Sequence, residues 1–117
     1  MVAAAGPLIK FLDMHRIAFT MKLFPGFEDE YRRRHAAIWP GLSALLHEAG
    51  IREYSIFLDE GTLVLFACFR VGDPALLERL PEHPVMKEWW EHMKDIMESH
   101  PDNSPVTRPL KEVFYME

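Results

Sequence analysis

The sequence is short of cysteine and glycine and has no long apolar run, and each shortage excludes a class of protein. A single cysteine, Cys68, rules out an intrachain disulfide, so the fold does not depend on an oxidising compartment. Cys68 lies in the apolar run 63–69, which is typical of an inert core thiol. No apolar run approaches the length of a membrane span. The six glycines form neither a dinucleotide-binding fingerprint nor a phosphate loop.

Basic charge is also scarce. The chain has 13 lysines and arginines against 18 aspartates and glutamates, a formal net charge of −5, so we expect no nucleic-acid partner and no membrane partner. The one basic cluster, residues 32–34, spreads around a helix and is predicted to be a solvated face with a salt bridge. Glu88 and His92 have helical metal-ligand spacing, but two ligands do not make a site, so no metal is expected.

The length and composition of the chain fit one small domain. The 117 residues are 49% hydrophobic and 12% aromatic, which is enough to bury a core but leaves little room for a second domain. Residues 1–14 are Ala-rich and are broken by Gly6-Pro7, Lys10 and Asp13, which does not suit a secretion signal. The sequence therefore predicts a leader over residues 1–14, a single domain over residues 15–117 and a cytoplasmic location.

Hydrophobic periodicity predicts four strands and four helices. Pro40 suits the first position of a helix, Gly50 suits the position after one, and Asp73 is a good N-terminal cap. The predicted strands are 16–23, 51–58, 63–71 and 113–116, and the predicted helices are 28–35, 41–49, 74–80 and 84–99.

This order of elements predicts an α+β, ferredoxin-like split βαβ sandwich with one antiparallel sheet and helices on one side. Strand 63–71 is apolar at nearly every residue, so we expect both of its faces to be covered. Because helices cover only one face of such a sheet, a second copy of the chain is the simplest cover for the other.

Tyr31 and His35 are the candidate catalytic pair. They lie four residues apart in a predicted helix, so a phenol and an imidazole project from one face, one turn apart. An imidazole titrates near neutral pH and can both give and take a proton there. The alternative is that His35 is only a favourable charge near a helix C-terminus.

Six segments together resemble the L-rhamnose mutarotase family. Their joint order and spacing carry the resemblance, which covers the chain from about Arg16 to its C-terminus. The family often has an Asn-Pro pair where this chain has Ala36-Ala37, a difference that bears on how His35 is held, and residues 1–14 lie outside the family pattern. The matching segments are 30–35, 38–40, 54–58, 89–90, 101–106 and 112–115.

The resemblance implies a dimeric α+β barrel and a cofactor-free epimerisation at the anomeric carbon of L-rhamnose. It implies that His35 is the catalytic acid and that Tyr31, Tyr54, Trp89 and Trp90 contact the sugar. The C–H-rich face of a 6-deoxy sugar suits stacking on an indole. Adjacent tryptophans on a helix point about 100° apart, so at most one is expected to face the site squarely.

Purely structural roles are the alternatives for several of these residues. Asp102 and Asn103 could hydrogen-bond sugar hydroxyls, but their run is by default turn chemistry. Tyr31 and Tyr54 could be half-buried core residues. Two other functions also stay open: a small cofactor-free monooxygenase with the same barrel, and a sugar-binding module without catalysis.

Overall fold

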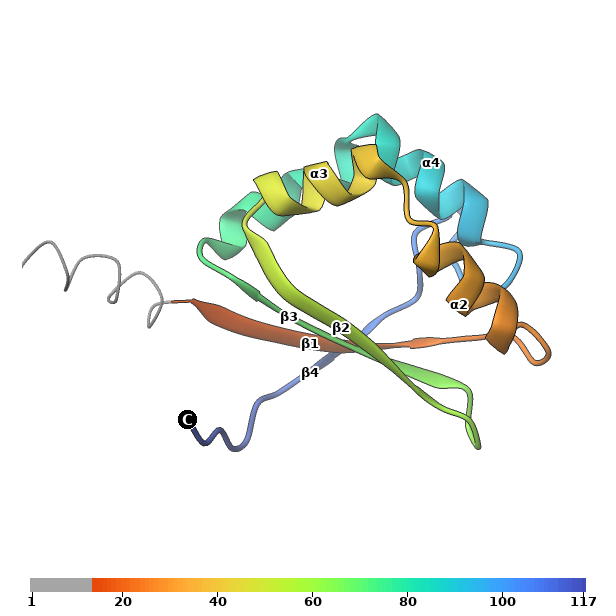
Figure 1. Cartoon of the computed structure of the whole chain (residues 1–117), viewed down its shortest axis with the longest axis horizontal. Coiled ribbons are helices and arrows are strands. Elements are labelled where there is room, and N and C mark those ends of the chain that lie inside the picture. Colours follow the sequence, from red (N-terminus) through yellow and green to blue (C-terminus); the bar gives the residue numbers. More distant parts are fainter. Residues whose placement is uncertain (1–13) are drawn as a thin grey trace, which may run out of the picture.

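The computed structural model describes residues 14–117, so the predicted leader, apart from Met14, lies outside the described residues. Four strands form a sheet, and the helices gather on one side of it (Figure 1). The elements are β1 His15–Lys22, α2 Glu28–Ala36, α3 Pro40–Glu48, β2 Ile51–Asp59, β3 Val64–Val71, the 3₁₀ helix η1 Pro74–Glu82, α4 Pro84–Met93 and β4 Arg108–Leu110.

The sheet has the strand order β2-β3-β1-β4, and every neighbouring pair is antiparallel. Strand β3 lies between β1 and β2, which makes β1 and β2 parallel to each other across a gap. This is the split βαβ arrangement. The predicted α+β fold with one antiparallel sheet is confirmed.

Strand β3 buries only one of its faces. Leu65, Ala67, Phe69 and Val71 alternate along the strand and are all buried on the side that the helices cover. Among residues 14–117, no helix lies over the opposite face of the sheet (Figure 1), and Phe66 remains 41% exposed there. Within residues 14–117 this face of the strand is open, and its cover by a second copy of the chain stays a prediction.

Cys68 shares the uncovered face of β3 and is exposed. The prediction that Cys68 is a core residue is therefore wrong for residues 14–117. The reason is the period-two alternation of a strand: an apolar run does not show which of its alternate residues meets the helices.

Helices α2 and α3 form where the local signals place them. Acidic residues occupy the first turn of α2 and basic residues its last turn, which complements the helix dipole. Pro40 is the first residue of α3, and Leu42 is its fully buried contact with the core. Gly50 follows with φ +89°, a left-handed conformation that favours glycine and ends the helix.

Helix α4 is shorter than predicted, because it ends at Met93 rather than near residue 99. Beyond its end, Phe24 N donates to Ile96 O and Glu98 N donates to Lys22 O, both at 2.9 Å. The backbone leaves the helix to bond to the end of β1, yet Ile96 still reaches the core with no exposed surface. The region predicted as a helix over 74–80 is a 3₁₀ helix, capped by Asp73 Oδ1, which accepts from Ala75 N at 3.0 Å.

The last strand lies earlier than predicted. Strand β4 pairs Arg108–Leu110 with residues 18–20 of β1, whereas residues 113–116, the predicted strand, have no regular structure. Val113 and Phe114 are largely exposed. Apolar composition alone could not distinguish a strand from a segment that runs past the sheet edge. No helix within residues 14–117 is long and apolar enough to cross a membrane.

Candidate active site

A cavity of about 1430 Å³ opens between the sheet and the helices. It exceeds the range of about 300–1,000 Å³ that is usual for small-molecule sites. Residues from α2, β2 and α4 meet on its walls although they are far apart in the sequence. Five of the seven predicted site residues line it: Tyr31, His35, Tyr54, Trp89 and Trp90.

Tyr31 and His35 face this cavity as a stacked pair. Their ring centroids are 4.2 Å apart, and the ring planes differ by 26°. The helical period of α2 brings the rings together, since residues four apart lie one above the other on a helix face. The predicted pairing of phenol and imidazole is therefore present.

The hydrogen bonding of His35 decides which ring nitrogen is available. Nδ1 lies 3.0 Å from the carbonyl oxygen of Tyr31. A carbonyl only accepts, so Nδ1 carries a proton and donates it, which leaves Nε2 as the nitrogen that gains or loses a proton. Within residues 14–117, Nε2 has no hydrogen-bond partner. Because every fully buried side-chain polar atom there has a partner, Nε2 is not fully buried, and it is open to the cavity.

Burial sets the protonation state of His35. It lowers the pKa of the imidazole below its ordinary 6.5, while the hydrogen bond to the Tyr31 carbonyl opposes that shift. Burial wins, because desolvation penalises the charged form of the ring. His35 is therefore mainly neutral near pH 7.

The Tyr31 hydroxyl is also open to the cavity. Tyr31 is only 8% exposed, and its hydroxyl makes no hydrogen bond among the described residues. Because every fully buried side-chain polar atom there has a partner, the hydroxyl is not fully buried. Burial raises the pKa of Tyr31 well above its usual value, and the nearby Tyr54 adds to the shift. The phenol therefore stays protonated and can donate.

Tyr54 reaches the cavity because strand β2 carries a bulge. The pairing with β3 shifts register between Arg52 and Ser55, and Glu53 has φ +52°. The extra residue puts Ile51 and Tyr54 on the same side of the sheet, although three residues apart on a regular strand face opposite ways. The Tyr54 ring then packs on Phe69, with centroids 5.2 Å apart. Burial raises the pKa of Tyr54 to about 12, although 40% of the residue surface stays exposed.

Helix α4 supplies an aromatic wall opposite α2. Trp89 is 8% exposed and meets His35 edge-on, with ring centroids 5.4 Å apart. It also meets Trp39 edge-on at 5.1 Å, so the imidazole is fixed against a packed cluster. Trp90 is partly buried and lines the same cavity. Trp89 packs in the core while Trp90 keeps more exposed surface, which agrees with the expected divergence of adjacent side chains.

Asp102 and Asn103 are not brought to this cavity. They line a hollow of about 610 Å³ that adjoins this cavity at Pro81 and Trp90, together with Glu91. Asp102 Oδ1 accepts from Ser104 N at 2.9 Å and also from the Ser104 hydroxyl, which is turn chemistry. Asn103 Nδ2 donates to Glu91 Oε2 at 2.6 Å. Within residues 14–117, no group of three or more His, Cys, Asp or Glu side chains could hold a metal ion.

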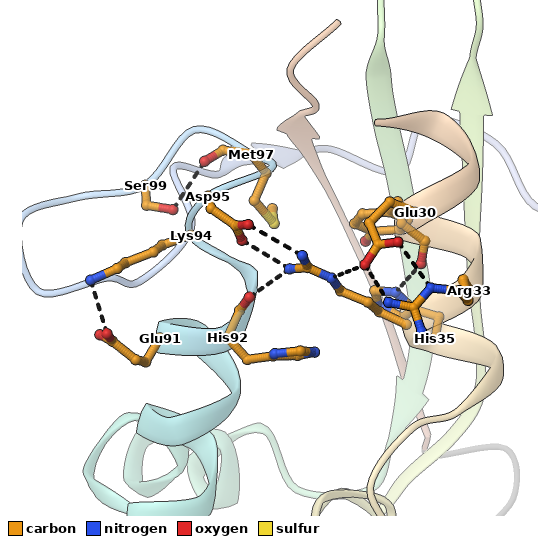
Figure 2. Close-up of polar contacts among 11 residues, drawn as sticks. Glu30, Arg33, His35, Glu91, His92, Lys94, Asp95, Met97 and Ser99 are labelled. Atoms are coloured by element: carbon orange, nitrogen blue, oxygen red, sulfur yellow. Dashed lines mark hydrogen bonds and ion pairs between the residues drawn. The ribbon is translucent and has the colours of Figure 1, made fainter. Parts of the chain in front are cut away.

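Sequence reasoning missed the role of Arg34. The prediction of a solvated basic face holds for Arg33, whose side chain is 70% exposed, but not for Arg34, at 11%. Figure 2 shows His92, in the last turn of α4, and Asp95, just past that helix, facing Glu30 and Arg33 of α2. Arg34 donates to Glu30 Oε2, to the His92 carbonyl and to Asp95 Oδ1. The signal available beforehand was the spacing of Glu30 and Arg34, four residues apart on a helix.

Comparison with known proteins gives a consistent result. The family model for L-rhamnose mutarotase matches residues 16–116. An L-rhamnose mutarotase of Agrobacterium fabrum is 55% identical over 104 residues, covering 89% of this chain and 97% of that protein. One of Flavobacterium johnsoniae is 55% identical over 102 residues, covering 87% and 95%. The crystal structure of an L-rhamnose mutarotase from Formosa agariphila superposes with a TM-score of 0.82 at 48% identity, covering 88% of this chain and 99% of that one.

Proposed function

Because the chain belongs to the L-rhamnose mutarotase family, we propose that it interconverts the α and β anomers of L-rhamnopyranose in the cavity between the sheet and the helices. It is an isomerase that acts on a carbohydrate. The supporting observation is the stacked pair of Tyr31 and His35, whose phenol oxygen and Nε2 both open on the cavity. The relatives favour neither a monooxygenase nor a binding module.

The reaction needs two proton transfers and no change of oxidation state. The anomeric hydroxyl loses its proton, the bond from C1 to the ring oxygen breaks, C1 becomes an aldehyde carbon and the ring oxygen gains a proton. Rotation of the aldehyde and the reverse steps close the ring as the other anomer. Because nothing is oxidised or reduced, the proposed reaction needs no redox carrier, and side-chain acids and bases can carry out both proton transfers.

His35 handles the proton of the anomeric oxygen. Its Nε2 is unprotonated near pH 7, since burial lowers the pKa of the ring, so it takes that proton as a base. When the ring closes, the imidazolium returns the proton and acts as the acid, which is the role that the family resemblance implies. Tyr31 gives a proton to the ring oxygen and recovers it on closure, and its raised pKa keeps it protonated at the start.

The remaining cavity residues bind and orient the sugar. Trp90 and Tyr54 offer aromatic faces to the C–H-rich side of a 6-deoxyhexose, and Trp89 holds His35 in place. We assign Asp102 and Asn103 no sugar contact in this proposal, because they line the adjoining hollow and not this cavity.

Saturation-transfer NMR on an equilibrium mixture of L-rhamnose anomers tests this function. We expect the protein to accelerate exchange between the anomeric signals, and His35→Ala to abolish the acceleration while the chain stays folded. His15→Ala is the matched control, because His15 does not line the cavity. Sugar binding without faster exchange would mean a binding module, and a fully active His35→Ala would remove His35 from the mechanism.

We further propose that the chain is a homodimer in which a second copy covers the open sheet face. That face carries Phe57, which is 67% exposed, beside its cross-strand partner Phe66. Leaving such an apolar patch in water is unfavourable, and closed two-fold symmetry is the commonest solution. Light scattering should report a dimer for the wild type and a monomer for Phe66→Asp. A monomeric wild type would refute the proposal.

The proposed location is the cytoplasm. The single cysteine, Cys68, forms no intrachain disulfide, so the fold is compatible with a reducing compartment. Fractionation of cells that express the full chain would test this location.

A further inference from the structure

The wall that would carry out the proton transfers and the wall that would bind the sugar belong to different helices. Helix α2 carries Tyr31 and His35, and α4 carries Trp89 and Trp90. A proton moves efficiently only when the heavy atoms come within about 2.6–3.2 Å, so the spacing of these walls has to be held to a fraction of an ångström. The edge-on contact of His35 with Trp89 also joins the two helices, but among the described residues it includes no hydrogen bond.

Arg34 connects the two helices with four polar contacts. Its Nε donates to Glu30 Oε2 on α2 at 2.7 Å. Its Nη1 and Nη2 donate to the two carboxylate oxygens of Asp95, just past α4, at 2.9 and 3.2 Å. Nη1 also donates to the carbonyl of His92 at 2.6 Å. That carbonyl belongs to the last turn of α4, where a helix leaves carbonyls without an internal partner.

The shape of this contact explains why an arginine is present. A guanidinium is a rigid, planar fork, so a two-point bond to Asp95 fixes direction as well as distance. The bond to Glu30 anchors the other edge of the same plane to α2. Figure 2 shows the two ends of this arrangement, with dashed lines at Glu30 on α2 and at Asp95 past α4.

We propose that Arg34 is a positioning residue for the anomer interconversion, which sets the distance between the α2 wall and the α4 wall of the cavity. The proposal rests on the proposed function. Arg34 does not line the cavity. It acts through His35, the next residue in the chain, and through the end of α4, three residues beyond Trp89 at His92.

The neighbouring arginine provides a matched control. Arg33 has the same side chain, lies on the same helix and also pairs with Glu30, but its ion pair within the described residues does not extend to α4. A general effect of helix charge on activity would therefore appear in both variants, whereas an effect of wall spacing would appear only at Arg34.

The test compares Arg34→Met with Arg33→Met by NMR exchange at several sugar concentrations, well below the unfolding temperature of each variant. We expect Arg34→Met to lower kcat about 10- to 100-fold, since a misplacement of 1 Å can cost about 10²-fold. KM should change less than about threefold, because stacking tolerates a shift that proton transfer does not. Arg33→Met should stay within about twofold of the wild type.

Arg34→Lys separates charge from geometry. It keeps the positive charge but cannot bond to Asp95, Glu30 and the His92 carbonyl at once. We expect its kcat to remain at least about fivefold below that of the wild type. A fully active Arg34→Lys would show that charge alone suffices and would overturn the proposal.

If Arg34→Met does not fold, Asp95→Ala alone removes the two-point bond past α4; we expect it to lower kcat, and a kcat within about twofold of the wild type would overturn the proposal. If Arg34→Met folds, a double-mutant cycle with Asp95→Ala adds a second test. If the two residues act as one tie, the double variant is no slower than Arg34→Met. Additive losses, or Arg34→Met within twofold of Arg33→Met, would overturn the proposal. An inactive wild type would instead refute the proposed function, so the two failures can be told apart.

Discussion

Removal of the Tyr31 hydroxyl is the sharpest test of the mechanism, because Tyr31→Phe changes chemistry without changing packing. The ring is 8% exposed and stacked on His35 at 4.2 Å, and phenylalanine keeps both the burial and the stack. The hydroxyl makes no hydrogen bond within residues 14–117, so its loss breaks no contact there. A change in rate would therefore report on the hydroxyl itself.

The expected magnitudes follow from these contacts. A buried hydrogen bond contributes about 0.5–1.5 kcal/mol to folding, and none is lost, so the free energy of unfolding should change by less than about 1 kcal/mol. A positioned general acid contributes about 10²- to 10⁴-fold in rate. That factor corresponds to about 2.7–5.4 kcal/mol in the activation free energy at 1.36 kcal/mol for each tenfold.

The assay is saturation-transfer NMR on L-rhamnose, paired with urea denaturation of the same sample. Tyr115→Phe is the matched control, because Tyr115 lies in the C-terminal segment, where its ring contacts Arg16, away from the cavity. We expect Tyr31→Phe to lower kcat at least about 100-fold with its stability unchanged. A rate within threefold of the wild type would refute the role of Tyr31 as the proton donor.

Two further predictions concern His35 and Trp89. His35 acts as a base only when neutral, so kcat/KM should fall as the pH drops through its pKa; burial lowers that pKa, so activity should persist to a pH below 6.5. A rate that instead rises on acidification through this range, after subtraction of the uncatalysed exchange, would contradict the base role. Trp89→Ala removes a ring that packs on both His35 and Trp39, so it should lower the free energy of unfolding by about 3–5 kcal/mol, measured by urea denaturation. A loss under about 1 kcal/mol would show that the cluster does not hold the imidazole.

The sequence predicted the parts of the site that local periodicity controls. Tyr31 and His35 stack because a helix brings residues four apart onto one face, whatever surrounds it. The ends of α2 and α3 followed from charge, proline and glycine signals that act within one turn. The end of α4 did not, because hydrogen bonds from distant residues 22 and 24 compete with the helix beyond Met93.

Long-range contacts controlled what the sequence missed or misplaced. Cys68 and Arg34 have ordinary local sequence patterns. Cys68 is exposed because it lies on the face of β3 that the helices do not cover, and Arg34 is nearly buried because Asp95 and His92 reach it from beyond and within α4. The same applies to Asp102 and Asn103, whose position depends on where the loop folds against α4 rather than on their own residue types.

The amino-acid sequence by itself determined the pairing of Tyr31 with His35, the order of the elements and the family, because each depends on spacing along one stretch of chain or on residue identity. Tertiary structure alone decided that Tyr54 and the tryptophans meet that pair, and that Arg34 joins α2 to α4. The physical reason is that side chains from separate elements come together only through packing and hydrogen bonds formed after those elements assemble, and these leave no periodic trace in the chain.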